Sequence, residues 1–348
     1  MLLHSTNGDT LAYLEPLLPA LQSRTGTLCA FVGNEVNLPG SPVAEKISFF
    51  ARSEPRFIFT QLPLEAGQWL YADCAASTVV EIPHALNPDA FRPELETRSR
   101  PIDIGARSAR YTPYVGDDDR NRLFDFFTSA EITRDLVVDI DTDSRFPRAE
   151  WAAFLNRCKG TVSTEAGSWY LERDDRTVNE IRSYVADQER RSGFMITADS
   201  PLRKLGHRLP WNVRVGLKRI MRRGFIRHEA SVNETLDAEE IINRFFEHRD
   251  RAPVYSKAVS SRHFDAIGTR TCQIMIEGRF NGVLKADEHY LALDREFKNM
   301  GSVLERFRDP AIRADITGAA LEHVMVKHTY AHRVEKVYQC VASSVLGN

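Results

Sequence analysis

The chain has 348 residues, of which 43% are hydrophobic and 27% charged, and its formal net charge at pH 7 is −2. This length is sufficient for two domains of ordinary size, and the composition is that of a globular protein. A net charge so close to zero excludes the strongly basic composition of many nucleic-acid-binding proteins, so we expect no nucleic-acid partner.

The cysteines and the apolar runs predict a cytoplasmic protein. Five scattered cysteines with no CxxC spacing indicate reduced thiols. The sequence has no apolar run of the length of a membrane span, and its first residues do not form a signal peptide.

The first part of the chain alternates between strands and helices. Short turns between these elements favour a parallel sheet covered by helices. The first strand is so short that we expect the first part of this domain to be reduced or absent. We predict strands at 2–4, 27–34, 56–61 and 78–84, and helices at 14–22, 43–53 and 65–74.

A proline-bearing segment at 84–101 predicts an exposed linker, after which a second alternating series begins. We predict strands at 101–107, 135–141, 160–168 and 272–278, helices at 117–130, 148–158, 177–191 and 255–268, and a helical end from 300 onward. The predicted fold class is therefore α/β, with two Rossmann-like domains. Residues 1–92 form a reduced N-terminal domain, 93–338 a C-terminal domain and 339–348 a tail. Ligands of such folds bind at the carboxyl ends of the strands, here facing the interdomain cleft.

The segment SSRHFDAIGTRTCQIMIEG (260–278) predicts a phosphate site at the start of a helix. Ser260 and Ser261 are good N-cap residues, and the free N–H groups that follow favour a diphosphate. Arg262 adds charge-assisted hydrogen bonds, and Asp265 lies one turn further on, within reach of ribose hydroxyls. The alternative is that Asp265 only complements the helix dipole.

Residues 260–290 resemble the donor-site segment of GT-B glycosyltransferases of the "group 1" type, nearest to the spore-maturation-protein-like branch. The stretches 82–91 and 327–337 resemble the interdomain segment and the closing helix of the same family. Asp265 stands where the family usually has Glu, so this shorter carboxylate would have to approach the ribose more closely. The residues that match the donor-site pattern are Arg262, Phe264, Ala266 and Gly268.

The resemblance implies the GT-B fold and a nucleotide-diphosphate sugar donor held mainly by the second domain. It also suggests Gly105 and Arg107 as contacts of the donor pyrophosphate, and His4 as an acid/base or sugar-binding residue. The alternatives are a simple strand-end turn with a solvent-facing Arg107, and a structural His4.

Further polar residues follow predicted strands and are candidates from position alone. We expect Glu165 in a catalytic or sugar-binding role, with Ser168 beside it, or else a solvated turn. Glu277 ends the next strand and is a candidate donor contact. Asn34 and Glu35 are candidates for acceptor or sugar contacts.

Two other patterns have less specific meanings. Asp139, Asp141 and Asp143 match an Asp-x-Asp metal motif, but we interpret them as a polar strand end and expect no metal and no cofactor besides the donor. The stretch 201–228 carries nine Lys and Arg residues without an acid, interleaved with apolar residues. It is either a solvated insertion or a peripheral contact with an anionic membrane surface.

The sequence therefore predicts a metal-independent glycosyltransferase that moves a hexosyl or related group to a glycan, glycolipid or lipid-linked acceptor, as in polysaccharide biosynthesis. A nicotinamide-dependent enzyme is disfavoured because no G-x-G-x-x-G follows a strand. The stronger alternative is a non-catalytic module that binds a sugar nucleotide or a protein partner.

Overall fold

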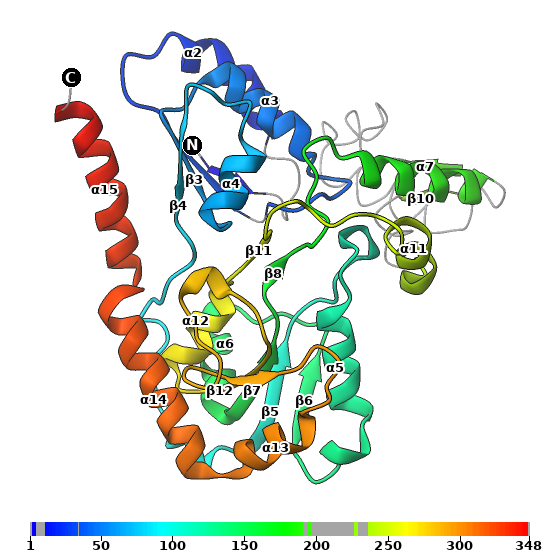
Figure 1. The fold of residues 1–348 in the computed structure, drawn as a ribbon, viewed down its shortest axis with the longest axis vertical. Helices are drawn as coiled ribbons and strands as arrows, with labels where there is room; N and C mark the ends of the chain where they lie inside the picture. The colour runs from blue at the N-terminus through cyan, green and yellow to red at the C-terminus, as the bar shows by residue number, and fades with distance from the viewer. Residues whose placement is uncertain are drawn as a thin grey trace, which may run out of the picture.

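The structure, a computed structural model, describes residues 2–4, 11–33, 35–190, 194–196, 226–228 and 236–346. Figure 1 shows two lobes along the long axis of the molecule, with helix α15 (Tyr330–Leu346) running up beside the first lobe. Each lobe is built around its own parallel sheet, so the predicted α/β fold with two Rossmann-like domains is confirmed.

The first lobe contains a four-stranded parallel sheet in the order β1-β2-β3-β4. β3 lies inside this sheet, and all four of its residues are buried. Helix α3 places Val43, Ile47 and Phe50 on one face, and all three are buried in the core of this lobe. The elements are β1 (Leu2–His4), α1 (Leu11–Leu14), α2 (Leu18–Gln22), β2 (Cys29–Gly33), α3 (Val43–Ser53), β3 (Phe57–Thr60), α4 (Leu64–Leu70) and β4 (Thr78–Glu81).

The second lobe contains a five-stranded parallel sheet in the order β13-β12-β7-β5-β6. The five residues of β12 are all buried, as expected for an inner strand that helices cover on both faces. The strands are β5 (Ile102–Arg107), β6 (Val138–Asp141), β7 (Cys158–Ser163), β12 (Cys272–Ile276) and β13 (Leu291–Leu293). The helices are α5 (Asp119–Ser129), α6 (Arg148–Arg157), α12 (Ser261–Gly268), α13 (Met300–Arg308) and α14 (Pro310–Lys327).

A helical pair, α7 (Arg176–Arg190) and α11 (Ala238–Phe245), projects to one side of the two lobes (Figure 1). The chain reaches and leaves this pair through the antiparallel strands β8 (Ala166–Gly167) and β11 (Lys257–Ala258). Leu171 on the outward path is buried in the core of the first lobe. The two helices share a core cluster with Tyr114 of the second lobe, and Leu38 of the first lobe packs against it. The segment therefore packs on both lobes, although it lies within the predicted second domain. The short strands β9 (Phe194–Ile196) and β10 (Ile226–His228) pair in parallel.

The predicted exposed linker at 84–101 is only partly exposed: residues 92–99 are mostly exposed, but the first part of the segment is docked. Leu86 and Phe91 are buried in a core cluster of the second lobe. Gly268 on α12 makes this possible, because a Cβ there would lie 2.6 Å from the Leu86 side chain and from the Phe91 carbonyl oxygen. Leu86 and Phe91, two apolar residues of this otherwise polar segment, pack against α12 and hold the segment there.

A second crossing runs beside this linker. The Leu86 N–H donates to the His328 carbonyl at 2.9 Å, and the Tyr330 N–H donates to the Leu86 carbonyl at 3.0 Å. From α15, Arg333 Nε donates to the Pro83 carbonyl at 3.0 Å. Residues 339–346, expected as a tail, continue helix α15. Two hydrogen-bonded segments therefore join the lobes at one place.

Gly105 lies in the middle of β5, and the space beside its Cα is filled by neighbouring side chains. A Cβ at this position would overlap Cys158 Sγ and lie 2.8 Å from the ring of Phe154 on α6. This face of Gly105 therefore packs against α6, and the predicted contact with a donor pyrophosphate stays a prediction.

We expect Gly105→Ala to lower the free energy of unfolding by about 1–3 kcal/mol, because the added methyl overpacks the contact between β5 and α6. Urea denaturation measures this change. Gly301→Ala on α13 is the matched control, since a Cβ there meets nothing within 4 Å, and it should not lower stability. Equal stability of Gly105→Ala and wild type would contradict the packing described here.

Candidate functional site

A cavity of about 680 Å³ opens between the two lobes. The first lobe lines it with residues that follow β2 and β3, such as Glu35 and Gln61. The second lobe lines it with residues that follow β5, β6 and β7, and with the start of α12. The cavity therefore lies at the carboxyl ends of strands from both parallel sheets, where ligands of such folds bind.

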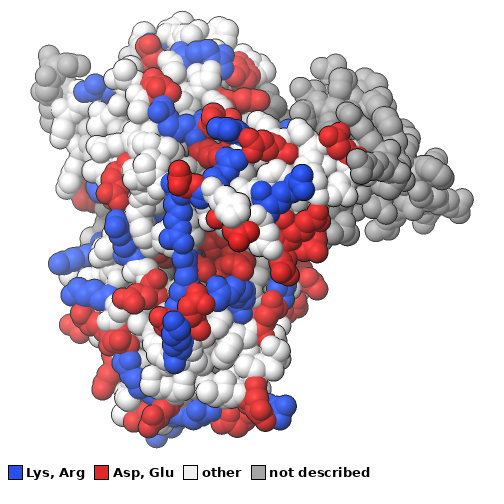
Figure 2. Space-filling view, turned by 45° about the vertical axis from the view of Figure 1, so that its right-hand side comes forward, with Lys and Arg blue, Asp and Glu red and all other residues white. Residues whose placement is uncertain are grey.

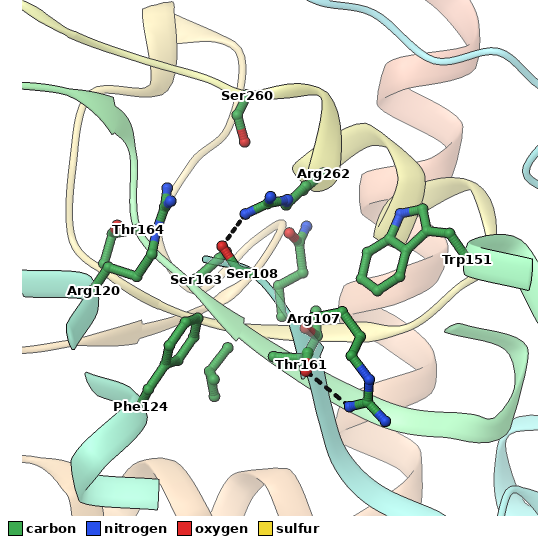
Figure 3. A pocket seen from close by; sticks show the side chains of 13 residues that line it. Arg107, Ser108, Arg120, Phe124, Trp151, Thr161, Ser163, Thr164, Ser260 and Arg262 are labelled. Carbon is green, nitrogen blue, oxygen red and sulfur yellow. Dashed lines mark hydrogen bonds between the residues drawn. The ribbon is translucent and has the colours of Figure 1, made fainter. Parts of the chain in front are cut away.

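Three arginines on the second-lobe wall distinguish this cavity. Arg120 comes from the first turn of α5, Arg145 follows β6, and Arg262 lies in the first turn of α12. Figure 3 shows Arg120 and Arg262 extending toward the same space beside Ser260. Among the described residues, none of the three forms an ion pair with a carboxylate. The wall is therefore locally cationic.

Hydrogen bonds to neutral groups hold two of these arginines in place. Arg262 donates to Ser108 Oγ (Figure 3). Arg120 donates to Tyr111 Oη at 2.8 Å, and its guanidinium carbon lies 3.9 Å from the centroid of that ring. Burial and the positive charge of Arg120 lower the pKa of Arg262 to about 10, so it stays cationic at neutral pH. A bound anion would relieve this repulsion.

The positive charge is local to the cleft. On the face shown in Figure 2, Lys and Arg lie among Asp and Glu over the described part of the molecule. Two of the three acids that precede Arg120 are already paired, because Lys257 Nζ lies 2.6 Å from Asp117 and Arg295 lies 2.6 Å from Asp119.

Helix α12 begins at Ser261 with Ser260 as its N-cap, one of the two N-cap residues that the sequence predicts. The predicted helix start at 255 is wrong, because Lys257–Ala258 form strand β11. Ser260 and His263 form a capping box, in which the Ser260 N–H donates to His263 Nδ1 at 3.0 Å. Burial lowers the pKa of His263 to about 3, so the imidazole is neutral and accepts this bond. The His263 N–H in turn donates to the Ser260 carbonyl at 3.2 Å, so the N–H groups of Ser261 and Arg262 are those of the first turn that lack an intrahelical partner. Ser261 and Arg262 bring this helix start to the cavity wall.

Asp265 lies one turn further along α12, behind this wall. Its carboxylate accepts a hydrogen bond from Trp151 Nε1 at 3.0 Å. Burial raises the pKa of Asp265 to about 7, although Trp151 and Arg262 act in the opposite direction. Asp265 is not among the residues that line the cavity, and its contact with a ribose stays a prediction.

Arg107 is committed to partners in its own lobe. Its guanidinium lies 2.7 Å from the Asp139 carboxylate and 4.3 Å from the centroid of the Phe154 ring. Figure 3 shows this side chain extending away from the space that Arg120 and Arg262 face.

The Asp-x-Asp pattern that includes Asp139 forms local contacts. Asp141 accepts from the Asp143 N–H at 2.8 Å. The described residues include no group of three or more His, Cys, Asp or Glu side chains placed to hold a metal ion.

Three other predicted site residues do not line the cavity. Glu165 is buried, accepts from Tyr255 Oη and from the Phe280 N–H at 2.6 Å, and has its pKa raised by burial. Ser168 is also buried and donates to the Val115 carbonyl at 2.6 Å. Glu277 is exposed beyond the end of β12. All three residues follow strands. Whether their side chains reach the cavity depends on partners distant in sequence and on the direction of the chain after the strand.

Glu35 is the one carboxylate among the described residues that line the cavity. It lies on the first-lobe wall and is buried. It accepts from Thr60 Oγ1 at 2.6 Å, from Tyr71 Oη at 2.7 Å and from the Gln61 N–H at 3.2 Å. Burial raises its pKa to about 6, against the effect of these hydrogen bonds. The cavity thus has this acidic residue on the first-lobe wall and the arginines on the second-lobe wall.

The remaining predicted positions fall outside the described part of the chain. Asn34, the side chain of His4 and the basic stretch 201–228, apart from the β10 backbone, lie outside the described residues; the His4 backbone ends β1.

Sequence reasoning missed Arg120, Arg145 and Tyr111. Arg145 carried a usable signal, because it follows the predicted strand at 135–141 and so belongs to the cleft edge. Arg120 did not, because it follows a run of three aspartates that suggests an acidic surface.

Two lobes with parallel sheets and an intervening cleft of strand ends define a GT-B-type architecture. Residues 190–339, fewer than half of the chain, match the family model described as "Glycosyl transferase-like". This match confirms, over that segment, the resemblance to glycosyltransferases. It does not confirm the spore-maturation-protein-like branch. No curated protein matches the chain.

Solved glycosyltransferase structures are similar at a low level. A glycosyltransferase from Rickettsia africae ESF-5 is 10% identical with a TM-score of 0.46, and the match covers 100% of this chain and 77% of that one. Sucrose-phosphate synthase from Thermosynechococcus elongatus is 12% identical with a TM-score of 0.46, covering 95% and 71%. Both TM-scores lie below 0.5, so the fold is defined by the two parallel sheets and not by these similarities. No described helix has the length and hydropathy of a membrane span.

The buried carboxyl of Glu35 predicts a pH dependence of stability. Its pKa is higher in the folded protein, about 6, than its ordinary value of 4.5. The folded state therefore favours the protonated form, and stability falls as the pH rises from about 4.5 through about 6, by about 2 kcal/mol. We expect Glu35→Gln to remove this part of the decrease.

Urea denaturation of both proteins at about pH 5 and about pH 7.5 measures the difference. The wild type should lose more stability than Glu35→Gln between these conditions. The same loss in both proteins would show that Glu35 ionises in the folded state as it does in the unfolded chain.

Proposed function

We propose that the protein transfers a sugar from a nucleotide-diphosphate sugar, bound by the second lobe, to an acceptor on the side of the first lobe. The observation that carries this proposal is the wall of Arg120, Arg145 and Arg262 beside the start of α12, with no carboxylate paired to these arginines among the described residues. The glycosyl transferase-like match over residues 190–339 supports the class of reaction.

The donor diphosphate would lie against the three arginines. Guanidinium groups bind phosphate oxygens in a bidentate fashion, and the first-turn N–H groups of α12 add donors and a positive dipole end. The ribose would then lie toward Asp265, one turn along the helix, which requires its carboxylate to exchange Trp151 for ribose hydroxyls. Gly105 and Arg107 would shape the wall behind the diphosphate through their packing on α6.

Transfer requires one bond to form and one to break. An acceptor hydroxyl attacks the anomeric carbon, and the bond from that carbon to the diphosphate oxygen breaks, so the nucleoside diphosphate leaves with the electron pair. The arginines stabilise this developing charge, a role that needs no metal. Glu35, ionised above a pH of about 6, would accept the proton of the acceptor hydroxyl.

We expect Arg120→Gln and Arg262→Gln each to weaken nucleoside diphosphate binding by at least about tenfold, because each removes a charge-assisted contact. Calorimetric titration with UDP, GDP and ADP identifies the base and measures the loss. Arg110→Gln is the matched control, since Arg110 lines the same cavity but pairs with Asp125, and it should bind nearly as the wild type does. Equal losses in all three variants would contradict a specific phosphate site.

We expect Glu35→Gln to lower the turnover of a bound nucleotide sugar by about a hundredfold or more, while donor affinity changes little. The measurement is release of nucleoside diphosphate, with water or an added sugar as the acceptor, beside calorimetry of the same variant. A wild-type protein that binds a nucleotide sugar without releasing product would favour the non-catalytic sugar-nucleotide-binding module.

A further inference from the structure

A second cavity, of about 660 Å³, lies on the second lobe away from the cleft. It runs between residues 93–98 and the start of α14, and it shares no lining residue with the interlobe cavity. Arg100 precedes β5 and Arg270 precedes β12, so this cavity lies at the amino-terminal edge of the sheet. We call it the arginine groove after four residues that line it, Arg98, Arg100, Arg270 and Arg313.

Arg100 is the most buried of the four, with 1% of its surface exposed. It donates to the Thr269 carbonyl at 2.7 Å, to the Cys158 carbonyl at 3.0 Å and to Thr271 Oγ1 at 3.1 Å. These partners are neutral, and among the described residues no carboxylate pairs with this guanidinium. Carbonyl and hydroxyl dipoles therefore stabilise the positive charge of Arg100, but no negative charge of the described residues neutralises it.

Arg270 and Arg313 have more unused donors. Arg313 is 5% exposed, and its guanidinium donates to the Phe307 carbonyl. Arg270 makes one long hydrogen bond, 3.4 Å, to the Ala314 carbonyl. The buried Nε atoms of Arg100, Arg270 and Arg313 have no hydrogen-bond partner among the described residues. The three arginines that line this cavity thus keep N–H donors that the described residues do not use.

The charges around the groove do not balance. Arg98 pairs with Glu96 at 2.9 Å, which leaves three arginines against the single carboxylate of Glu94. The start of α14 adds little, because Asp309 caps it by accepting from the Ala311 N–H at 2.8 Å. Several partly desolvated cations without counter-charge are costly to keep, and an excess of N–H donors over acceptors suits an oxyanion.

We propose that the arginine groove is a second anion site, which binds the phosphate group of a small phosphorylated compound independently of the donor site. The volume is within the range of small-molecule pockets and exceeds what a single phosphate fills. Planar guanidinium groups recognise phosphate oxygens in pairs, which explains why arginine and not lysine lines the groove.

The test is calorimetric titration of the full chain with inorganic pyrophosphate, in the wild type and in an Arg120→Gln background that weakens the cleft. Arg270→Gln should lower the groove affinity by at least about tenfold in both backgrounds. Arg270→Lys, which keeps the charge but loses the fork, should give an intermediate loss. Arg134→Gln, exposed and paired with Glu131 elsewhere, is the matched control and should bind as the wild type does.

Melting temperatures establish that each variant is folded. Arg313→Gln removes a second arginine of the groove and should also weaken pyrophosphate binding. Pyrophosphate binding that is unchanged in folded Arg270→Gln and Arg313→Gln proteins would overturn the proposal. So would a single site abolished by Arg120→Gln alone. Vesicles of phosphatidylcholine with and without phosphatidic acid distinguish the source: binding that needs phosphatidic acid and Arg270 would assign a lipid phosphate, and binding of pyrophosphate alone a soluble one.

Discussion

The arrangement of the cleft depends on a surplus of positive charge that the protein leaves uncompensated. Arg120, Arg145 and Arg262 line one wall, while the neighbouring acids Asp117 and Asp119 are neutralised by Lys257 and Arg295. These two carboxylates therefore pair with other cations and do not neutralise the three arginines of the wall. Burial and the neighbouring Arg120 lower the pKa of Arg262, and a bound anion would offset this cost.

The position of the first-lobe wall relative to the arginines depends on the two segments that cross between the lobes. The linker is docked on α12 through Leu86 and Phe91, and α15 returns beside it through Arg333. Because α12 also carries Arg262, the helix that positions one of the arginines of the cleft wall is the helix that anchors the linker. Glu35, held by Thr60 and Tyr71 in the first lobe, is thereby brought to the same cavity as the arginines.

The sequence was sufficient to predict the parallel sheets and the N-cap of α12 at Ser260, because strand periodicity and capping are local properties. It was not sufficient to predict which strand-end side chains face the cleft. Glu165 is turned inward by Tyr255, ninety residues later, and Arg107 is held by Asp139 on the neighbouring strand. Position after a strand identifies the edge of the sheet, but the direction of a side chain depends on partners distant in sequence. The docking of the first part of the linker was missed because its few apolar residues are outnumbered by charged and proline residues in the segment.

The most direct measurement is a crystal structure of the protein with the nucleoside diphosphate that it binds most tightly. We expect the diphosphate between Arg120, Arg145 and Arg262 at the start of α12, with the ribose toward Asp265. A nucleoside diphosphate bound elsewhere, or a vacant cleft in a well-ordered crystal at saturating ligand, would contradict the proposed donor site.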